Sequence, residues 1–307
     1  MSHTRILPAD DGGIAEAARL ILAGQPVAVP TETVYGLAAD ATSGEAVARI
    51  YAAKGRPSFN PLIVHVRGIE EAARIAQLDE RARRLAERHW PGPLTMVLPL
   101  RPDAPVASLV TAGLKTVAIR AAAHPAMRAL LQATGRPLAA PSANASGRIS
   151  PTRAAHVLAS LDGRIPLILD AGATSHGLES TIVAVRETAL ELLRPGPISA
   201  DELGARAAQG RAIEAPGQLA SHYAPAKPLR LDALKARPDE WLIGFAPIPG
   251  HSTLSASGDL TEAAARLFDR LHEADASTHP AIAVAPIPDT GIGTAIMDRL
   301  RRAAAPR

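Results

Sequence analysis

No cysteine occurs among the 307 residues of this chain. This absence excludes structural disulfides, a thiolate nucleophile and zinc sites built from cysteine. Aromatic residues make up only 3% of the chain, so its core has to be built from Ala, Val, Leu and Ile. No run approaches the roughly 18 uninterrupted apolar residues of a membrane span, and the N-terminal segment lacks the layout of a signal peptide. We therefore expect a soluble, cytoplasmic protein with no membrane partner.

A large charge surplus is also missing. The formal net charge is +3, and the ten Lys/Arg and ten Asp/Glu that follow Pro225 place the whole surplus before that point. Such a small surplus gives weak support for nucleic-acid binding and permits a phosphate-bearing small molecule. The apolar fraction of 47% and the charged fraction of 21% are typical of a folded globular protein, and the length predicts two domains.

Helical and extended patterns alternate over the first two hundred residues, which predicts an α/β domain around a twisted mixed sheet. Strands are expected at residues 27–30, 62–66, 94–100, 116–120, 137–141, 165–172 and 179–185. Helices are expected at residues 13–22, 45–53, 69–89 (as one or two), 125–134 and 151–161. Ser199 and Glu202 have capping-box spacing, which predicts a further helix that runs to about Gln209.

A proline-rich stretch without helical period, Ala215–Pro228, predicts a linker. Two strand patterns and two helical patterns beyond it, the latter over residues 261–274 and 293–304, indicate a small β/α domain. The expected organisation is a first domain over residues 1–212, a linker over residues 213–228 and a second domain over residues 229–307.

Two cations stand between a predicted helix and a predicted strand in YAAKGRPSFNPLIVHV. Gly55 lets the helix stop, and Pro57 moves Arg56 out of helical geometry. Lys54 and Arg56 could simply complement the dipole at the helix C-terminus. They could also bind an anion.

Asn60 and His65 follow within the same twelve residues. Each has an ordinary alternative, Asn60 as a turn residue and His65 as a core or edge histidine. The gathering of Lys, Arg, Asn and His side chains at strand edges nevertheless favours an anion site.

Further polar residues lie where predicted strands begin or end. Arg120 ends the strand that Thr116 begins, and Arg194 precedes a Pro-Gly-Pro corner. The loop PLAAPSANASGRISPT offers hydroxyls and amides that could hold phosphate oxygens, while Ser150 before Pro151 is well placed as the N-cap of the next helix. No GxxxxGK[ST] motif is present, so any use of ATP has to proceed without a P-loop.

Taken together, these segments resemble the threonylcarbamoyl-AMP synthase family, the YrdC-like proteins, in the two-domain form with a linker and a C-terminal Rossmann-like domain. The matching segments follow in order along nearly the whole chain: PTETVYGL, KGRPSFNPLIVHV, WPGPLT, TVAIR, HP, APSAN, SPT, GLESTIV, LLRPGP, HYAP and GIGTAIMDR.

The resemblance implies an activity. L-threonine and bicarbonate or CO₂ would form N-carboxy-threonine, whose carboxylate attacks the α-phosphate of ATP to give threonylcarbamoyl-AMP and pyrophosphate. Mg²⁺ would accompany ATP, with metal ligands that the sequence leaves unknown. Downstream enzymes would transfer the threonylcarbamoyl group to an adenosine of tRNA next to the anticodon.

The resemblance also implies site residues, position by position. Those that would contact L-threonine are Thr33, His65, Arg120, Ala140 and Ser180. Those that would contact ATP are Arg56, Asn60, Thr116, Ser142, Ser150, Arg194 and Tyr223. Lys54, Arg56 and Arg194 would supply catalytic positive charge to the phosphates, and the linker with Tyr223 would cover the site as a lid.

Two alternatives stay open. A YrdC-like fold could bind double-stranded RNA on a basic face, although stacking aromatics are scarce, so weak RNA binding is a possible addition. A related enzyme class adenylates carbamate, but it carries acylphosphatase and zinc-finger segments, and this cysteine-free chain has neither.

Overall fold

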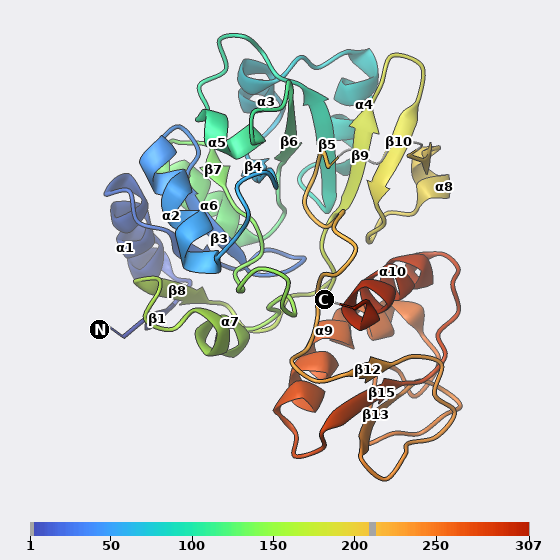
Figure 1. Ribbon diagram of the computed structural model, residues 1–307. Coiled ribbons are helices and arrows are strands. Elements are labelled where there is room, and N and C mark those ends of the chain that lie inside the picture. Colours follow the sequence, from blue (N-terminus) through green and yellow to red (C-terminus); the bar gives the residue numbers. More distant parts are fainter. Residues whose placement is uncertain (1–2, 209–212, 307) are drawn as a thin grey trace.

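The computed structural model describes residues 3–208 and 213–306, which form two α/β units built around separate sheets (Figure 1). Within these residues the first sheet has eleven strands in the order β1-β8-β2-β3-β7-β4-β6-β5-β9-β10-β11, and its pairs are both parallel and antiparallel. Its strands are β1 (Arg5–Pro8), β2 (Val27–Val29), β3 (Gly36–Asp40), β4 (Ile63–His65), β5 (Leu94–Pro99), β6 (Thr116–Arg120), β7 (Leu138–Ala139), β8 (Leu167–Asp170), β9 (Thr181–Val185), β10 (Leu190–Arg194) and β11 (Arg206–Ala207).

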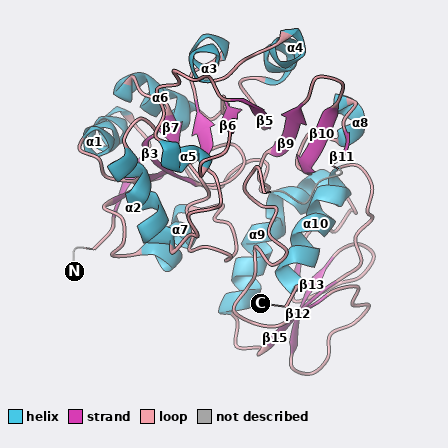
Figure 2. Ribbon diagram, turned by 45° about the horizontal axis from the view of Figure 1, so that its top comes forward, coloured by secondary structure: helices cyan, strands magenta, loops and turns pink. Residues whose placement is uncertain are grey.

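Helices surround this sheet on several sides, as the view coloured by secondary structure shows (Figure 2). They are α1 (Asp11–Leu22), α2 (Gly44–Lys54), α3 (Ile69–Ile75), α4 (Glu80–His89), α5 (Ser108–Thr111), α6 (Pro125–Thr134), α7 (Ala154–Leu161) and α8 (Ala200–Leu203). The expected twisted mixed-sheet α/β domain is therefore confirmed.

The second unit is a parallel sheet of four strands, within the described residues, in the order β12-β15-β13-β14. Its elements are β12 (Leu229–Arg230), β13 (Glu240–Gly244), β14 (Ser252–Thr253), β15 (Ala281–Val284), α9 (Leu260–Ala276) and α10 (Ile292–Ala304). Both helices lie between this small sheet and the first unit (Figure 1). The expected small Rossmann-like α/β unit is thus present, and its helices face the rest of the chain.

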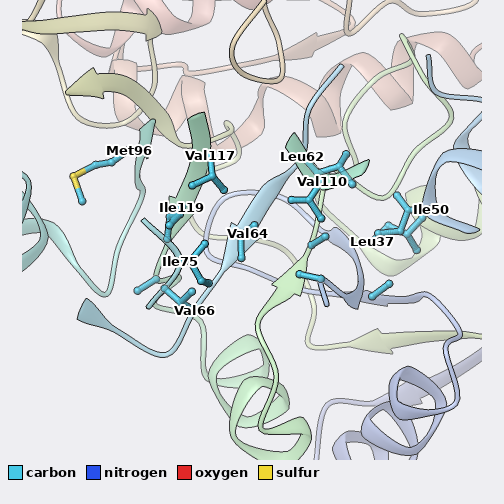
Figure 3. Packing of buried hydrophobic residues seen from close by; sticks show 14 of the residues in the cluster. Leu37, Ile50, Leu62, Val64, Val66, Ile75, Met96, Val110, Val117 and Ile119 are labelled. Carbon is cyan, nitrogen blue, oxygen red and sulfur yellow. The ribbon is translucent and has the colours of Figure 1, made fainter. Parts of the chain in front are cut away.

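The core of the first unit is aliphatic, as the scarcity of aromatics predicts. Figure 3 shows a close-packed part of it, in which Val64, Met96 and Ile119 come from adjoining strands and Ile50 and Ile75 from the helices that cover them. Fully burying one such side chain contributes about 1.5–3 kcal/mol. This packing fixes the strands whose ends carry polar residues.

Helix α2 ends where the sequence predicts. Ser43 caps its start by accepting a hydrogen bond from the amide of Ala46 at 3.2 Å, and Gly55 adopts left-handed geometry (φ 58°) at its end. A residue without Cβ takes this conformation at little cost. The helix stop holds Lys54 and Arg56 at the corner before β4.

Two boundary predictions are wrong. Helix α7 begins at Ala154 with Arg153 at its N-cap position, so Ser150 does not cap it; Ser150 is instead buried and bonded to Glu179. The capping box at Ser199 is confirmed, but α8 ends at Leu203, because Gly204 turns left-handed and strand β11 follows. The expected end near Gln209 lies outside the described residues.

The strand predictions hold in position and fail in length and number. The stretch PLAAP contributes only two strand residues, since its last residues turn away toward the cavity described below. Among the described strands, β1, β3, β11, β12 and β14 have no counterpart among the predictions, and β10 corresponds only to the strand expected to end at Arg194. None of the helices described is long and apolar enough to cross a membrane.

Candidate active site

A cavity lies at the ends of β4 and β6, under the segment that joins the two units. Its volume is about 40 Å³, far below the roughly 300–1,000 Å³ of ordinary ligand pockets. It is lined by Thr31, Thr33, Val34, Gly36, Arg56, Ile63, His65, Arg120, Ala140, Pro141, Ser142, Glu179, Ser180, Arg194, Pro216, His222 and Tyr223. All five predicted threonine contacts are among them, as are Arg56, Ser142, Arg194 and Tyr223 of the predicted ATP contacts.

Sheet register brings the two central residues together. Strands β4 and β6 run parallel with His65 opposite Arg120, so both side chains sit where adjacent strands end. Both are almost completely buried. Burial and the nearby charge of Arg120 lower the pKa of His65 to about 3, so its imidazole is neutral at pH 7, and its Nδ1 has no partner within the described chain.

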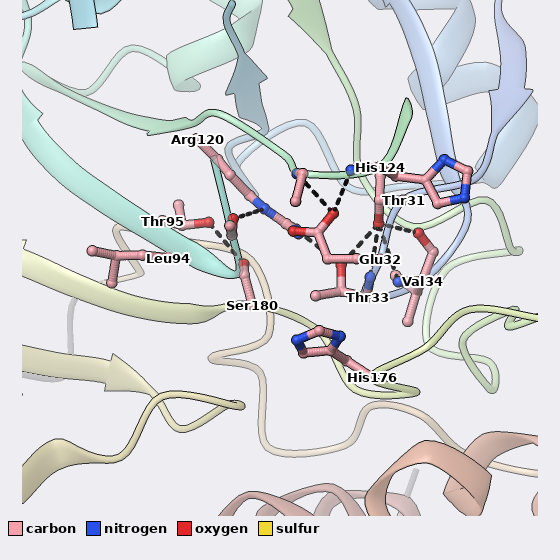
Figure 4. Close-up of polar contacts among 12 residues, drawn as sticks. Thr31, Glu32, Thr33, Val34, Leu94, Thr95, Arg120, His124, His176 and Ser180 are labelled. Atoms are coloured by element: carbon pink, nitrogen blue, oxygen red, sulfur yellow. Dashed lines mark hydrogen bonds and ion pairs between the residues drawn. The ribbon is translucent and has the colours of Figure 1, made fainter. Parts of the chain in front are cut away.

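Arg120 is held in an ion pair that the sequence analysis did not expect (Figure 4). Its Nη2 donates to Glu32 at 2.6 Å, its Nη1 to the hydroxyl of Thr33 at 2.9 Å and its Nε to the carbonyl of Gly92 at 3.1 Å. Burial acts to raise the pKa of Glu32, but the charge of Arg120 outweighs it and lowers that pKa to about 2. The guanidinium is therefore fixed in position before any ligand arrives.

Thr33 joins this network through a chain of hydroxyls. The hydroxyl of Thr31 donates to the carbonyl of Val34 at 2.6 Å, so Thr33 donates to Thr31 over 2.9 Å while it accepts from Arg120. A hydroxyl has one proton and two lone pairs, so Thr33 keeps one acceptor position. Thr33 lines the cavity, so a ligand bound there can donate to this hydroxyl.

The corner after α2 contributes one cation to the cavity and one to a loop. Arg56 donates from Nε to the carbonyl of Asn60 at 3.1 Å and from Nη2 to that of Pro61 at 2.8 Å, and its side chain also contacts the hydroxyl of Tyr51. Lys54 does not line the cavity; its ammonium donates to the carbonyls of Ser142 (2.6 Å) and Asn144. Lys54 therefore holds the loop that carries Ser142.

Arg194 lies on the opposite side of the cavity, at the end of β10. It donates to the carbonyl of Ser180 at 2.8 Å and to the hydroxyl of Ser180 at 3.0 Å, and that hydroxyl also contacts Thr95 at 2.7 Å. Burial lowers the pKa of Arg56 to about 10, which leaves this side chain charged at pH 7, and burial moves the pKa of Arg194 in the same direction.

Neither Arg56 nor Arg194 forms an ion pair with any described residue. Their contacts are to carbonyl and hydroxyl oxygens, whereas Arg120 is paired with Glu32. Two buried guanidinium groups without a carboxylate at ion-pair distance therefore face this small cavity. Such an arrangement is complementary to an anion with several charges.

Three predicted ATP contacts do not line the cavity. Asn60 is buried just beyond Arg56, and both polar atoms of its side chain lack partners in the described chain. Thr116 begins β6 at the end remote from Arg120 and lines a separate surface depression beside Pro99. Ser150 is bonded to Glu179, one of the residues that line the cavity.

The segment between the two units closes the cavity. Tyr223 is completely buried with φ 61°, and its hydroxyl has no partner within the described chain. Ala224 anchors the segment by a 2.8 Å hydrogen bond to the carbonyl of Gly147. A Cβ on Gly217 (φ 88°) would lie only 2.7 Å from both the Tyr223 hydroxyl and Arg194, so the linker packs directly on the site.

Thr31, Glu179 and His222 line the cavity and the carboxylate of Glu32 holds Arg120, yet none of these four residues was among the predicted contacts. Glu32 and Thr31 lie beside Thr33 in PTETVYG, and Glu179 precedes Ser180, so adjacency to a predicted residue was the available signal. Burial lowers the pKa of His222 to about 3, which makes it neutral beside Tyr223.

Comparison with protein families gives two matches. The family model described as "Telomere recombination" matches residues 19–196, and the model described as "Threonylcarbamoyl-AMP synthase, C-terminal domain" matches residues 180–305. Threonylcarbamoyl-AMP synthase of Bacillus subtilis is 40% identical over 98% of this chain and 95% of that protein. The protein of the same name from Pyrococcus abyssi is 39% identical over 94% of this chain and 92% of that one.

A solved structure has the same architecture. The crystal structure of Pyrococcus abyssi Sua5 complexed with L-threonine superposes with a TM-score of 0.90 at 36% identity, over 98% of each chain. Fold and site thus define a two-domain α/β enzyme of the nucleotidyltransferase class. The chain belongs to the threonylcarbamoyl-AMP synthase family. This membership does not favour double-stranded RNA binding as its main function.

Proposed function

We propose that this chain synthesises L-threonylcarbamoyladenylate in the cavity between β4, β6 and the linker. Threonine and bicarbonate or CO₂ give N-carboxy-threonine; its carboxylate oxygen bonds to the α-phosphorus of ATP, and the bond from that phosphorus to the bridging oxygen breaks to release pyrophosphate. The observation that carries the proposal is the pair of buried guanidinium groups, Arg56 and Arg194, without carboxylate partners across one cavity.

Threonine occupies the end of the cavity where β4 and β6 stop. Arg120, already oriented by Glu32, donates to the substrate carboxylate, and Thr33 offers its remaining acceptor position. Neutral His65 orients the amino acid by a hydrogen bond, because a pKa near 3 makes its imidazole a weak base at pH 7. Ala140 and Ser180 complete the walls.

ATP extends from this end past Ser142 toward Asn60. Arg56 and Arg194 receive the phosphates from opposite sides, and the two unpartnered polar atoms of Asn60 are available to the nucleotide. Lys54 acts by holding the Ser142 loop. Thr116 and Ser150 contact the nucleotide beyond the closed cavity. Charge neutralisation and positioning supply the catalysis, since the attacking oxygen belongs to the substrate.

Mg²⁺ would accompany ATP. The residues that line the cavity fit phosphate rather than a metal, since the guanidinium groups are cationic and the carboxylate of Glu179, like that of nearby Glu32, is bonded to an arginine. When bound to the phosphates, the ion would neutralise charge on the departing pyrophosphate. The residues of the chain bind and orient the substrates.

The linker serves as a lid. ATP does not fit a cavity of about 40 Å³, so Tyr223 and its neighbours have to move for substrate entry. N-carboxy-threonine loses CO₂ readily in water, and a closed lid excludes water while it reacts. This role accords with a domain organisation of residues 1–212, linker 213–228 and residues 229–307.

The test is pyrophosphate release from ATP by the purified protein in bicarbonate buffer, with and without L-threonine. Release that requires both threonine and bicarbonate supports the proposal. Absence of release by a folded sample refutes it and directs attention to salt-dependent RNA affinity. Transfer of the product to tRNA by partner enzymes, in the cytoplasm, is the downstream step we propose.

A further inference from the structure

A buried ion pair joins the second unit to the active-site cavity. Arg299 of α10 is completely buried, and its Nε donates to the Oε2 of Glu179 at 2.8 Å across 120 residues of sequence. Its Nη1 donates to Asp298 at 2.8 Å. Helix α10 lies on the side of the small unit that faces the first sheet (Figure 1). The second unit therefore places one cation next to the reaction site.

Glu179 is the group that Arg299 holds. It lines the cavity, and its other oxygen, Oε1, accepts a hydrogen bond from the hydroxyl of Ser150. Ser150 is fully buried and is one of the residues proposed to contact ATP. The chain of contacts thus runs from α10 through a carboxylate to a nucleotide-binding hydroxyl.

A carboxylate on the wall of a site for a polyanion needs compensation. Without a cation, a buried Glu179 would repel the triphosphate or take up a proton and lose its hold on Ser150. Burial acts to raise the pKa of Glu179, but the charges of Arg299 and Arg194 outweigh it and keep this pKa below its usual range. Arg299 thereby keeps Glu179 ionised and leaves Arg194 for the ligand.

Arg299 also lies against the lid. Its guanidinium carbon is 5.2 Å from the centre of the Tyr223 ring, a distance at which a cation attracts the ring face. Phe268 of α9 contacts the same ring at 5.7 Å between centroids. Arg299 of the second unit therefore contacts both Tyr223 of the lid and the carboxylate of Glu179.

We propose that Arg299 is a positioning residue for ATP: it neutralises Glu179 and orients Ser150 from the second unit, so that this unit takes part in nucleotide binding. The proposal rests on the function proposed above. It assigns the second unit a role beyond carrying the linker.

The experiment compares Arg299→Met, which removes the charge but keeps much of the volume, with Arg301→Met as control. Arg301 lies on the same helix, is exposed and pairs with Asp289 at 2.7 Å, away from the cavity. We expect Arg299→Met to raise the KM for ATP by roughly 10- to 100-fold, because a buried carboxylate loses its partner, and the KM for threonine far less. Arg301→Met should leave both unchanged.

A double variant tests charge compensation directly. The double variant Arg299→Met with Glu179→Gln removes both charges, so its KM for ATP should return to within about 3-fold of that of Glu179→Gln alone. A merely structural role of Arg299 would instead give additive losses. Additivity, or an equal rise in both KM values, overturns the inference.

The controls separate this inference from the proposed function. If the wild type shows no threonine-dependent pyrophosphate release, the proposed function fails; if it is active and Arg299→Met matches it, only the inference fails. If Arg299→Met does not fold, the double variant decides. A KM for ATP near that of Glu179→Gln supports the inference, and a KM for ATP more than about 10-fold above that of Glu179→Gln overturns it.

Discussion

Replacing Glu32 by Gln tests whether the pair with Arg120 stabilises the protein as well as the site. Gln keeps the shape of Glu32 but removes the charge opposite Arg120. Both carboxylate oxygens of Glu32 accept hydrogen bonds, one from Arg120 and the other from the backbone amides of Ala123 and His124, whereas the side chain of Gln has only one acceptor oxygen. The pair is buried, so the lost charge is not replaced by water. We expect a marked loss of stability at pH 7.

The magnitude follows from the pKa of Glu32. Lowering it from 4.5 to about 2 corresponds to about 3 kcal/mol of folding free energy at pH 7. Because the pKa is lowered on folding, this contribution is complete above pH 4.5 and is lost as the pH falls through 2. About 1 kcal/mol should be lost by pH 4 and about 2 kcal/mol by pH 3.

Urea unfolding of the wild type and Glu32→Gln at pH 7, 4 and 3 measures this difference. The gap between the two proteins should narrow as the pH falls, while Glu45→Gln, which breaks an exposed pair with Arg49, should stay within about 1 kcal/mol of the wild type throughout. A gap of the same size at pH 7 and pH 3 would refute the argument that the charge of Glu32 carries the stabilisation.

Three further substitutions test the two subsites and the lid by steady-state kinetics. Arg56→Ala should raise the KM for ATP and lower turnover, by about 10-fold or more, because it removes a buried cation that we propose faces the phosphates; wild-type kinetics would place Arg56 outside the site. Arg120→Ala should raise the KM for threonine more than that for ATP, and the reverse order would mean that the two subsites are exchanged. Tyr223→Ala should lower the yield of threonylcarbamoyl-AMP per ATP cleaved while the first unit stays folded, and an unchanged yield would end the lid hypothesis.

Strand positions were predictable because buried strands in this chain are short apolar runs bounded by Gly, Pro or polar residues. TVAIR became β6 from Thr116 to Arg120 without adjustment, and Gly55 ended α2 as its backbone freedom predicts. Local rules failed where tertiary contacts decide. Ser150 has the sequence context of an N-cap, yet its hydroxyl bonds Glu179, a residue 29 positions away, and the helix starts later.

The site shows the same division. The residues that the sequence singled out are those whose charge or position after a strand is visible locally, such as Arg120 and Arg194. The residues that hold the site in place were not visible in the sequence. Glu32 meets Arg120 only in the folded sheet, and Arg299 meets Glu179 only where the two units contact each other. Pairing of buried charges is a property of the tertiary structure, so composition and spacing do not specify it.

The two basic residues of the corner KGRP, Lys54 and Arg56, hold two different segments of the chain. Lys54 is the last residue of α2 and points to the loop with Ser142 and Asn144, whose carbonyls it holds; burial and the nearby Arg56 lower its pKa well below the usual value. Arg56, two residues on, turns toward the carbonyls of Asn60 and Pro61 and lines the cavity. One helix end therefore fixes both segments that we propose to meet ATP, the loop before α7 and the approach to β4. A change in the angle of this end would move both segments, so we expect the Gly55 turn to fix the position of the proposed nucleotide site.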